Sequence, residues 1–453
     1  MNIHSRLHAG YKLVLLLFLA GSPLARADDL LSVFLLAEQS DPQYRAAIAT
    51  HSAALEIVPQ SLAALLPELS LGADVSWNRF HDRRPGPGEK ENTHSTNEVY
   101  AARLRQSIYH RDRFIRLAQA DSRVAQADAE LVAARQELIL RTARRYFLVL
   151  GAQDNLEFVR ADRDAVARTL EQAKQRFEVG LTAITDVYEA QARYDVALSE
   201  KIRTEQLLDD TREALRELTG EIPGDLEILK PEIPLLSPAP ADTEQWVSTA
   251  TEQNPLLLAR RAATEAARQE IQVQRSGHYP SMDLTANYAR KNIQFGGVDP
   301  QERNDSAIGI EVIMPLYQGG MVSSQTRQAR DLFTQAQEEQ EKQRREVERQ
   351  ARDSYRGVLA EISNVKALQQ AMLSSEKALE ASEAGFEVGT RTIVDVLDSQ
   401  RGLLRARRDH ARSRYDYLLD TLSLKRSAGI VEATDLEQIN DMMETPPVTA
   451  TRE

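Results

Sequence analysis

The chain of 453 residues contains no cysteine. This absence excludes disulfide bonds, catalytic thiolates and cysteine-ligated metals. The eight histidines show none of the spacings of a metal site, and the sequence holds no HExxH motif, nucleophile elbow or phosphate-binding loop. We therefore expect no enzyme: no catalytic residue, no bound metal and no cofactor.

The chain also lacks a surplus of basic residues, since its net charge is −12 and its isoelectric point is near 5.4. Phosphate backbones require a basic protein face, so we do not expect a nucleic-acid partner. After the amino-terminal segment, no stretch approaches the roughly 18 consecutive apolar residues that a transmembrane helix needs. We therefore expect no transmembrane helix.

Residues 1–27 have the pattern of a signal peptide. Arg6 and Lys12 give a positive start, residues 13–20 are apolar, and residues 25–27 have the small-x-small form of a cleavage site. We expect export, with the mature chain beginning near Asp28. A long exported chain without cysteine favours a bacterial periplasm or outer membrane over a disulfide-rich extracellular module.

Two stretches of the chain are copies of each other. Residues 385–400, GFEVGTRTIVDVLDSQ, repeat the pattern of residues 176–191, RFEVGLTAITDVYEAQ, with identical residues at the same spacing. Such spacing indicates an internal duplication. We predict a first repeat, a proline-rich connector, a second repeat and a partly disordered tail, over residues 28–230, 231–242, 243–430 and 431–453 respectively.

Each repeat is predicted to contain a short helix, two strands, a long helix and a second short helix. In the first repeat these helices are expected at residues 42–66, 111–179 and 185–218, and in the second repeat the last short helix is expected at residues 394–427. A helix of roughly 70 residues is about 100 Å long. Such a length indicates coiled-coil packing and not a globular core helix.

The four predicted strands have one apolar and one polar face. They are expected at residues 68–80, 97–109, 282–288 and 308–314, with a loop at 292–304 between the last two. One-sided strands of this kind are typical of a transmembrane β-barrel. Four strands cannot close around a pore, whereas three chains would supply twelve. The alternative is an ordinary antiparallel sheet packed on the chain's own helices.

The duplicated stretches describe a helix end, a tight turn and a new helix. Gly180 and Gly389 suit the left-handed position just past a helix end. Thr392 and Asp395 have the spacing of a capping box that opens the next helix. Asp395 is therefore either a capping carboxylate or a functional residue, and these residues leave both interpretations open.

The chain resembles the TolC family of outer-membrane channel-tunnels in three features. These are the duplicated turns, the run GTRTIVDVLD at residues 389–398 and the run PLYQGGMV at residues 315–322. The resemblance covers residues 29–439. It implies a mainly α fold with a β membrane part, in which three chains form a long coiled-coil α-helical barrel across the periplasm. The same trimer would form a twelve-stranded β-barrel in outer-membrane lipid, with four strands from each chain.

The resemblance also implies the function and the partners of the chain. The homotrimer would be a passive exit duct for drugs or secreted proteins, as in multidrug efflux and type I secretion. An inner-membrane transporter of the RND, ABC or MFS type would deliver the cargo, and a periplasmic adaptor, or membrane fusion protein, would join the two. The cargo and the particular pump are not given by the sequence.

By the same resemblance, the tip of the helical barrel carries a gate that is closed at rest. Asp395 and Asp398 lie at i,i+3, and threefold symmetry would turn each into a ring of carboxylates that binds cations. Crowding of like charges would raise the pKa values of these carboxylates. Arg391 is expected to act as a gate latch by bonding Thr185 and Asp186 of the first-repeat turn.

Two positions depart from the family prototype. This chain has Phe386 where the prototype has a tyrosine. It has Thr169 where the prototype has a glutamine, at a position opposite Glu383. Glu383 is also expected to be a latch residue. Both changes remove or shorten a polar link, so we predict a less tightly latched tip. The turns expected to contact the adaptor contain Gly180, Leu181, Thr182, Gly389 and Thr390.

A periplasmic coiled-coil adaptor or scaffold protein is the alternative from another class. It shares export and long helices with a channel, but it does not need four strands with an apolar face. Dependence on detergent separates the two classes, because an adaptor without its signal segment dissolves in water.

Overall fold

The computed structural model describes residues 28–81, 92–221, 224–295 and 300–446. The predicted signal peptide and the last seven residues of the predicted tail lie outside these ranges.

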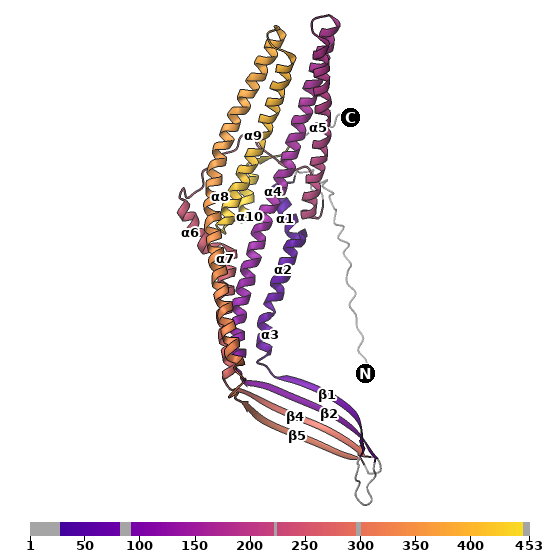
Figure 1. Cartoon of the computed structure of the whole chain (residues 1–453), viewed down its shortest axis with the longest axis vertical. Coiled ribbons are helices and arrows are strands. Elements are labelled where there is room, and N and C mark those ends of the chain that lie inside the picture. Colours follow the sequence, from indigo (N-terminus) through magenta and orange to yellow (C-terminus); the bar gives the residue numbers. More distant parts are fainter. Residues whose placement is uncertain (1–27, 82–91, 222–223, 296–299, 447–453) are drawn as a thin grey trace, which may run out of the picture.

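Two long helices form the body of a rod (Figure 1). They are α4 (Arg111–Glu178), of 68 residues, and α8 (Met321–Glu387), of 67 residues. Each reverses at a short turn and returns, as α5 (Ile184–Thr219) or α9 (Ile393–Ser427). The long helix predicted at residues 111–179 and the returning helices predicted at 185–218 and 394–427 are confirmed to within a residue or two. Within the described part of the chain, no helix is both long and apolar enough to cross a membrane.

The two hairpins pack through α4 and α9. They lie side by side along the rod (Figure 1), and contacts between them continue close to the turns at the end opposite the sheet. The rod is therefore two helical hairpins joined along one seam, which we call the α4–α9 seam.

The single helix predicted for residues 42–66 is wrong. The structure has α2 (Pro42–Leu55) and α3 (Ile57–Ala63), with Glu56 between them. Pro59 explains the interruption, because its ring clashes with the carbonyl of residue 55 and its nitrogen cannot donate the helical hydrogen bond. The predicted start is confirmed, since the Asp41 carboxylate accepts a 2.8 Å bond from the backbone N–H of Tyr44.

Short elements surround the middle of the rod, and we call them the equatorial elements. Their core includes Leu30, Phe34, Tyr146, Leu215 and Leu436, all fully or almost fully buried. None of these segments was predicted from the sequence, since they are short and make contacts with residues far away in the sequence. The equatorial elements are α1 (Leu30–Ser40), α6 (Thr243–Gln253), α10 (Ala433–Asn440), β3 (Ile228–Leu229) and β6 (Met443–Glu444).

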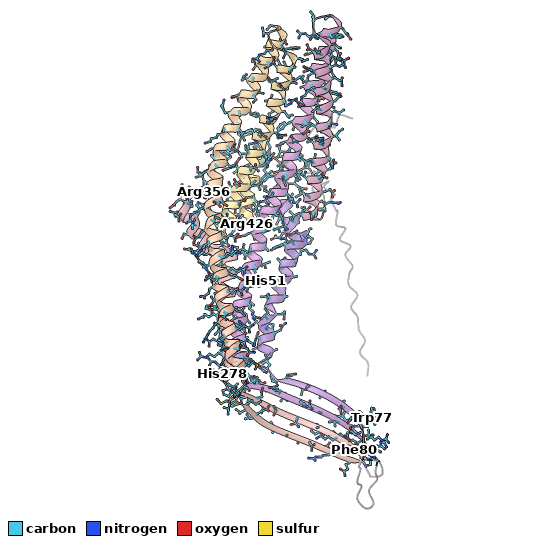
Figure 2. The ribbon with its side chains drawn as sticks, in the orientation of Figure 1. His51, Trp77, Phe80, His278, Arg356 and Arg426 are labelled. Carbon is cyan, nitrogen blue, oxygen red and sulfur yellow. The ribbon has the colours of Figure 1, made fainter. Side chains whose placement is uncertain are left out.

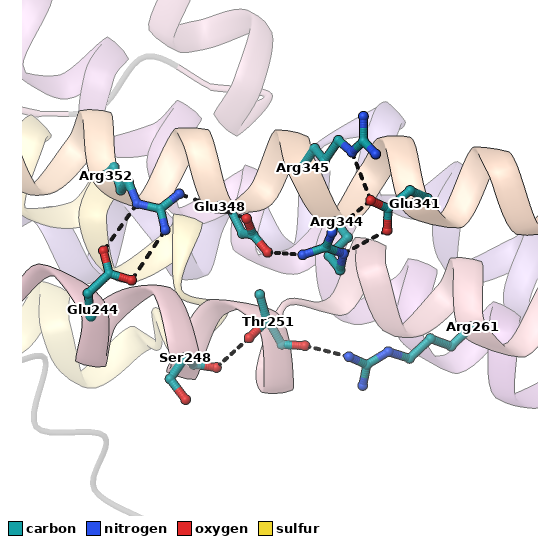
Figure 3. Close-up of polar contacts among 9 residues, drawn as sticks. All are labelled: Glu244, Ser248, Thr251, Arg261, Glu341, Arg344, Arg345, Glu348 and Arg352. Atoms are coloured by element: carbon teal, nitrogen blue, oxygen red, sulfur yellow. Dashed lines mark hydrogen bonds and ion pairs between the residues drawn. The ribbon is translucent and has the colours of Figure 1, made fainter.

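The helix α6 packs on α8 through a buried apolar cluster that includes Val247 and Ala351, and one exposed ion pair bridges the two helices (Figure 3). The Arg352 guanidinium donates to both carboxylate oxygens of Glu244, at 3.3 and 3.2 Å. Along the same stretch of α8, Glu341 accepts from Arg344 and Arg345 at 2.7 Å each. This face of α8 is therefore solvated and charged, and charge pairs one turn apart support the long helix.

The sheet projects from the other end of the rod (Figure 1). Its strands are β1 (Glu68–His81), β2 (Asn92–Tyr109), β4 (Ser281–Phe295) and β5 (Gln301–Ile313), all antiparallel in the order β1-β2-β4-β5. The helix α7 (Pro255–Arg275) and the 3-10 turn Ser276–His278 lead into β4. Trp77 and Phe80 lie at the far end of the sheet, and His278 lies at the near end (Figure 2).

The loop predicted at residues 292–304 is shorter than expected, because the β4–β5 ladder continues to Ile293 and Gln301. Ion pairs between β4 and β5 stabilise this longer ladder. Arg290 pairs with Glu302 at 3.2 Å, and Lys291 pairs with Asp305 at 3.0 Å.

The apolar face of the sheet is not covered by the chain's own helices. Leu71 is 82% exposed and Ile308 is 76% exposed. The alternative of a sheet packed on its own helices is therefore wrong. Large apolar side chains on an open sheet indicate a surface that another apolar phase or protein covers.

Candidate functional site

The two hairpin turns have the same backbone geometry. Gly180 has a φ of 74° and Gly389 a φ of 77°, in the left-handed region that favours glycine. In the first turn the backbone N–H of Leu181 donates to the carbonyl of Arg176 at 2.8 Å. In the second, the N–H of Thr390 donates to the carbonyl of Gly385 at 2.8 Å. The duplication thus reproduces a glycine helix end of the Schellman type at both tips.

Side chains at the turns are presented outward. Leu181 is 74% exposed, and Thr182, Gly180, Gly389 and Thr390 are also exposed or partly exposed. These residues were predicted to contact an adaptor. The structure places them at the extreme end of each hairpin (Figure 1).

Asp395 caps α9. Its carboxylate accepts bonds of 2.8 Å from both the backbone N–H and the hydroxyl of Thr392, and its own N–H donates to that hydroxyl at 3.3 Å. The predicted capping box is confirmed. Bonds from the Thr392 backbone, then from the Thr392 hydroxyl, and the charge of Arg391 hold the pKa of Asp395 below its usual value.

Asp398 lies one turn further along α9, and its side chain is 64% exposed. Its carboxylate is 3.3 Å from a guanidinium nitrogen of Arg401, while Asp395 is 3.9 Å from a guanidinium nitrogen of Arg391. Each candidate ring carboxylate therefore has an arginine partner on or next to its own helix. Each partner weakens the local negative charge within one chain.

Within the described residues of one chain, Arg391 makes no recorded contact with Thr185 or Asp186. Asp186 instead accepts a hydrogen bond from the hydroxyl of Thr182 in its own turn. The latch expected between these groups thus stays a prediction, and the geometry leaves Arg391 available to another chain.

Thr169 lies on the α4–α9 seam, close to α9. Its hydroxyl donates to the carbonyl of Ala165 at 3.1 Å and accepts from the side-chain amide of Gln400 at 3.5 Å. Among the described residues no contact of Thr169 with Glu383 is recorded. Thr169 is thus brought to Gln400, a partner that the sequence did not indicate.

Phe386 joins the two hairpins near their tips. The guanidinium of Arg176 lies 4.6 Å from the centroid of its ring. Phe386 also packs against a buried cluster that includes Val166, Ile393 and Leu397. Arg176 was not identified from the sequence as a candidate residue. A signal for it exists, because Arg176 directly precedes Phe177, which corresponds to Phe386 in the duplicated stretch.

Buried acids lie further along the seam, towards the equatorial elements. Asp162 pairs with Arg193 at 3.0 Å, with side chains only 7% and 10% exposed. Asp154 accepts a 2.7 Å bond from the hydroxyl of Tyr415. Burial raises the pKa values of both Asp154 and Asp162 above the usual value. These polar links connect the helices of the rod inside its apolar core.

The described residues contain no group of three or more histidines, aspartates or glutamates placed to hold a metal ion. The arrangement at the tips is instead a pair of exposed glycine turns with acidic and basic side chains close behind them. Such an arrangement can bind charged partners and can pair with other copies of itself.

Comparison with known proteins agrees with this architecture. The model of the family described as outer membrane efflux protein matches residues 34–221 and 246–430. The chain is 39% identical to outer membrane protein TolC of Vibrio cholerae serotype O1, over 91% of this chain and 93% of that protein. It is 27% identical to the alkaline protease secretion protein AprF of Pseudomonas aeruginosa, over 92% of this chain and 87% of that protein.

A solved structure shares the fold. The outer membrane channel CmeC of Campylobacter jejuni superposes with a TM-score of 0.77, over 98% of each chain, at 15% sequence identity.

Proposed function

The chain belongs to the outer membrane efflux protein family, and from this premise we propose that three copies form one channel-tunnel. The protein is an outer-membrane exit channel and not an enzyme. In the proposed assembly, twelve strands close a β-barrel in the outer membrane, and the helical hairpins form an α-helical barrel across the periplasm.

The open sheet with its exposed apolar face carries this proposal. The outer edges of β1 and β5 have no strand partner within the described chain, and an unpaired strand edge in hydrocarbon costs several kcal/mol for each polar group. Pairing β5 of one chain with β1 of the next satisfies both edges. The apolar side chains then face lipid, and the alternating polar side chains face the lumen.

Exposed apolar residues on α5 support assembly of the helices as well. Tyr188, Val196 and Ile202 are 68%, 57% and 61% exposed. α5 lies at one side of the rod and α8 at the other, since α4 and α9 pack between them. We propose that α5 of one chain packs against α8 of the next and closes the helical barrel.

The gate is proposed at the hairpin tips. Asp395 and Asp398 would each form a ring of three carboxylates around the threefold axis. Because Arg391 makes no contact with Thr185 or Asp186 in its own chain, its latch partner would be the first-repeat turn of a neighbouring subunit. Phe386 lacks the hydroxyl of the family prototype, so this latch would be weak.

The partners are proposed from the relatives. AprF is named for secretion of an alkaline protease, and TolC is an outer membrane protein. We propose that this trimer accepts drugs or secreted proteins from inner-membrane transporters of the RND, ABC or MFS type through a periplasmic adaptor. The adaptor would contact the exposed turns at Gly180 and Gly389.

The test is purification of the mature chain in detergent, followed by mass measurement and recording in planar bilayers. We expect a trimer that conducts ions. A monomer that stays soluble without detergent would contradict the proposal and would favour the periplasmic adaptor alternative. Because the chain has no cysteine, cysteine pairs introduced on β1 and β5 would report whether these edges meet between subunits.

A further inference from the structure

A groove runs along α4 between α5 and α9, at the same level of the rod as the equatorial elements. Its volume is about 450 Å³. Small-molecule sites in proteins commonly enclose roughly 300–1,000 Å³. All of its lining residues come from these three helices of one chain, so the groove is complete before any assembly.

The floor of the groove is apolar. Leu148 and Leu207 are 51% and 48% exposed, so two large aliphatic side chains of the groove are open to a bound molecule. Phe147 stacks on Tyr415 with ring centroids 5.4 Å apart and forms one wall. Gly151 keeps the centre open, because it adds no side chain to the floor. An apolar body of moderate size therefore fits this space.

The rim of the groove carries an excess of positive charge. Arg412 is 3.4 Å from the carboxylate of Asp416, which balances its charge. Asp154 is bonded to Tyr415, and burial raises its pKa. Arg144 has no ion-pair partner in the described part of the chain.

Arg408 also contributes to this excess. Its closest recorded carboxylate is that of Asp409, the next residue in sequence, at 3.7 Å. Arg144 and Arg408 are thus the two charges of the rim that an incoming anion can neutralise.

The groove faces away from the equatorial elements. Tyr146 donates its hydroxyl to the carbonyls of Asp28 and Glu227, and the hydroxyl of Tyr417 bonds the backbone of Leu236. Leu148 and Tyr415 lie two residues from these tyrosines, which is about 200° around each helix. The equatorial elements and the groove thus lie on opposite faces of α4 and α9. If the helices form the tube proposed above, with the equatorial elements outside, the groove lines the tunnel.

A row of arginines leads to the groove along the same face of α9. Arg401, Arg405, Arg408 and Arg412 are spaced by four, three and four residues, which places them on one helix face, and all are exposed. The row begins beside Asp398 at the tip. In a trimer, three such rows would give this section of the tunnel a positive wall behind the acidic tip.

We propose that this groove is a binding site for anionic amphiphiles. The apolar body would lie on Leu148 and Leu207, which the buried ring of Phe147 supports, and the anionic group on Arg144 and Arg408. The location inside a tunnel rests on the proposed function, whereas the groove itself does not. The site would let the channel wall hold such cargo transiently. This property goes beyond that of a passive duct.

The test uses the trimer in amphipol and 8-anilinonaphthalene-1-sulfonate, which is fluorescent, aromatic and anionic. We expect saturable binding that laurate displaces and that the same concentration of dodecyltrimethylammonium does not. Arg144→Glu should weaken binding at least tenfold, and Gly151→Leu should remove it by filling the groove. Arg45→Glu is the matched control, because Arg45 is an exposed arginine on α2 with no recorded partner.

The possible outcomes distinguish failure of the proposed binding site from failure of the proposed channel function. Unchanged affinity in both groove variants, with trimers that still conduct, would overturn the site and leave the channel intact. Equal displacement by the cationic amphiphile would also overturn it. A wild-type sample that binds the probe at the groove but neither trimerises nor conducts would instead reject the proposed function and the location inside a tunnel.

Discussion

The guanidinium of Arg176 lies over the ring of Phe386, 4.6 Å from its centroid, and so connects α4 to α8 close to the two turns. The contact crosses from one hairpin to the other. Any movement that separates the hairpin tips must therefore break it. A cation over an aromatic ring contributes about 0.5–1 kcal/mol at exposed sites.

Arg176→Gln should therefore make the closed tip less stable. A loss of about 0.5–1 kcal/mol corresponds to a few-fold increase in the open population. Single-channel recording in planar bilayers measures it as higher mean conductance. Lys174→Gln removes the same charge from an exposed position two residues away and should have no such effect.

Phe386→Tyr should lower conductance below that of the wild type. The new phenol keeps the ring under Arg176 and adds the hydroxyl that the closing network of the family prototype contains. Phe386→Leu removes the ring and should raise conductance. An unchanged or higher conductance in Phe386→Tyr would show that the missing hydroxyl does not limit closure in this chain.

Cysteine substitution should detect the proposed latch. In the cysteine-free background, the pair Arg391→Cys and Thr185→Cys should form disulfides between subunits on mild oxidation, and denaturing gels should show covalent trimers. Crosslinking should also lower conductance, since it holds the tip shut. Disulfides formed only within single chains would contradict a latch between neighbouring subunits.

The secondary structure of the tips could be predicted from sequence, whereas most of their contacts could not. The repeated glycine and the Thr392–Asp395 spacing are local signals, and both turns and the capping box follow from them. Gln400 and Thr169 are separated by 231 residues, so nothing local indicates that they meet. The adaptor and latch roles depend on other chains and remain predictions.

The equatorial elements were harder to predict for the same reason. The backbone N–H of Leu30 donates to the side chain of Asn440, 410 residues away. Short helices such as α1 and α10 gain little from propensity and depend on such tertiary contacts. The break before α3 is different, because Pro59 was a local signal in the sequence and predicts an interruption.

Trivalent cations should block the channel through the tip carboxylates. Asp398→Asn should weaken block by lanthanum, because it removes three charges from one ring. Asp395→Asn should do the same while keeping the N-cap bond, because the Thr392 hydroxyl accepts it from the backbone N–H of residue 395. Asp409→Asn, a charge removal on α9 away from the tip, serves as control. Equal block in all variants would exclude these rings as the cation site.

The cap at Asp395 should also make the second turn sensitive to acid. Its folded-state pKa is lowered, so its stabilisation is complete above the unfolded pKa of about 3.9 and is lost as pH falls through the folded value. Hydrogen exchange corrected for intrinsic rates should show the first turn of α9 opening more readily at pH 3 than at pH 6. Thr392→Ala should reduce this difference without abolishing it, because it removes the bond from the Thr392 hydroxyl and keeps the bond from the Thr392 backbone N–H.

The two faces of β5 should respond oppositely to a new charge. Ile308 is 76% exposed on the apolar face, and in the proposed barrel it meets lipid. An arginine near the middle of the membrane on such a face costs about 2–4 kcal/mol, so Ile308→Arg should sharply reduce the yield of folded trimer. Ala307→Arg places the same side chain on the adjacent, opposite face, towards the lumen. It should keep trimer yield and shift ion selectivity towards anions.

Band intensity of the trimer on mildly denaturing gels and reversal potentials in a salt gradient measure the two effects. Equal losses of trimer in both variants would mean that the two faces of the sheet do not divide lipid from lumen.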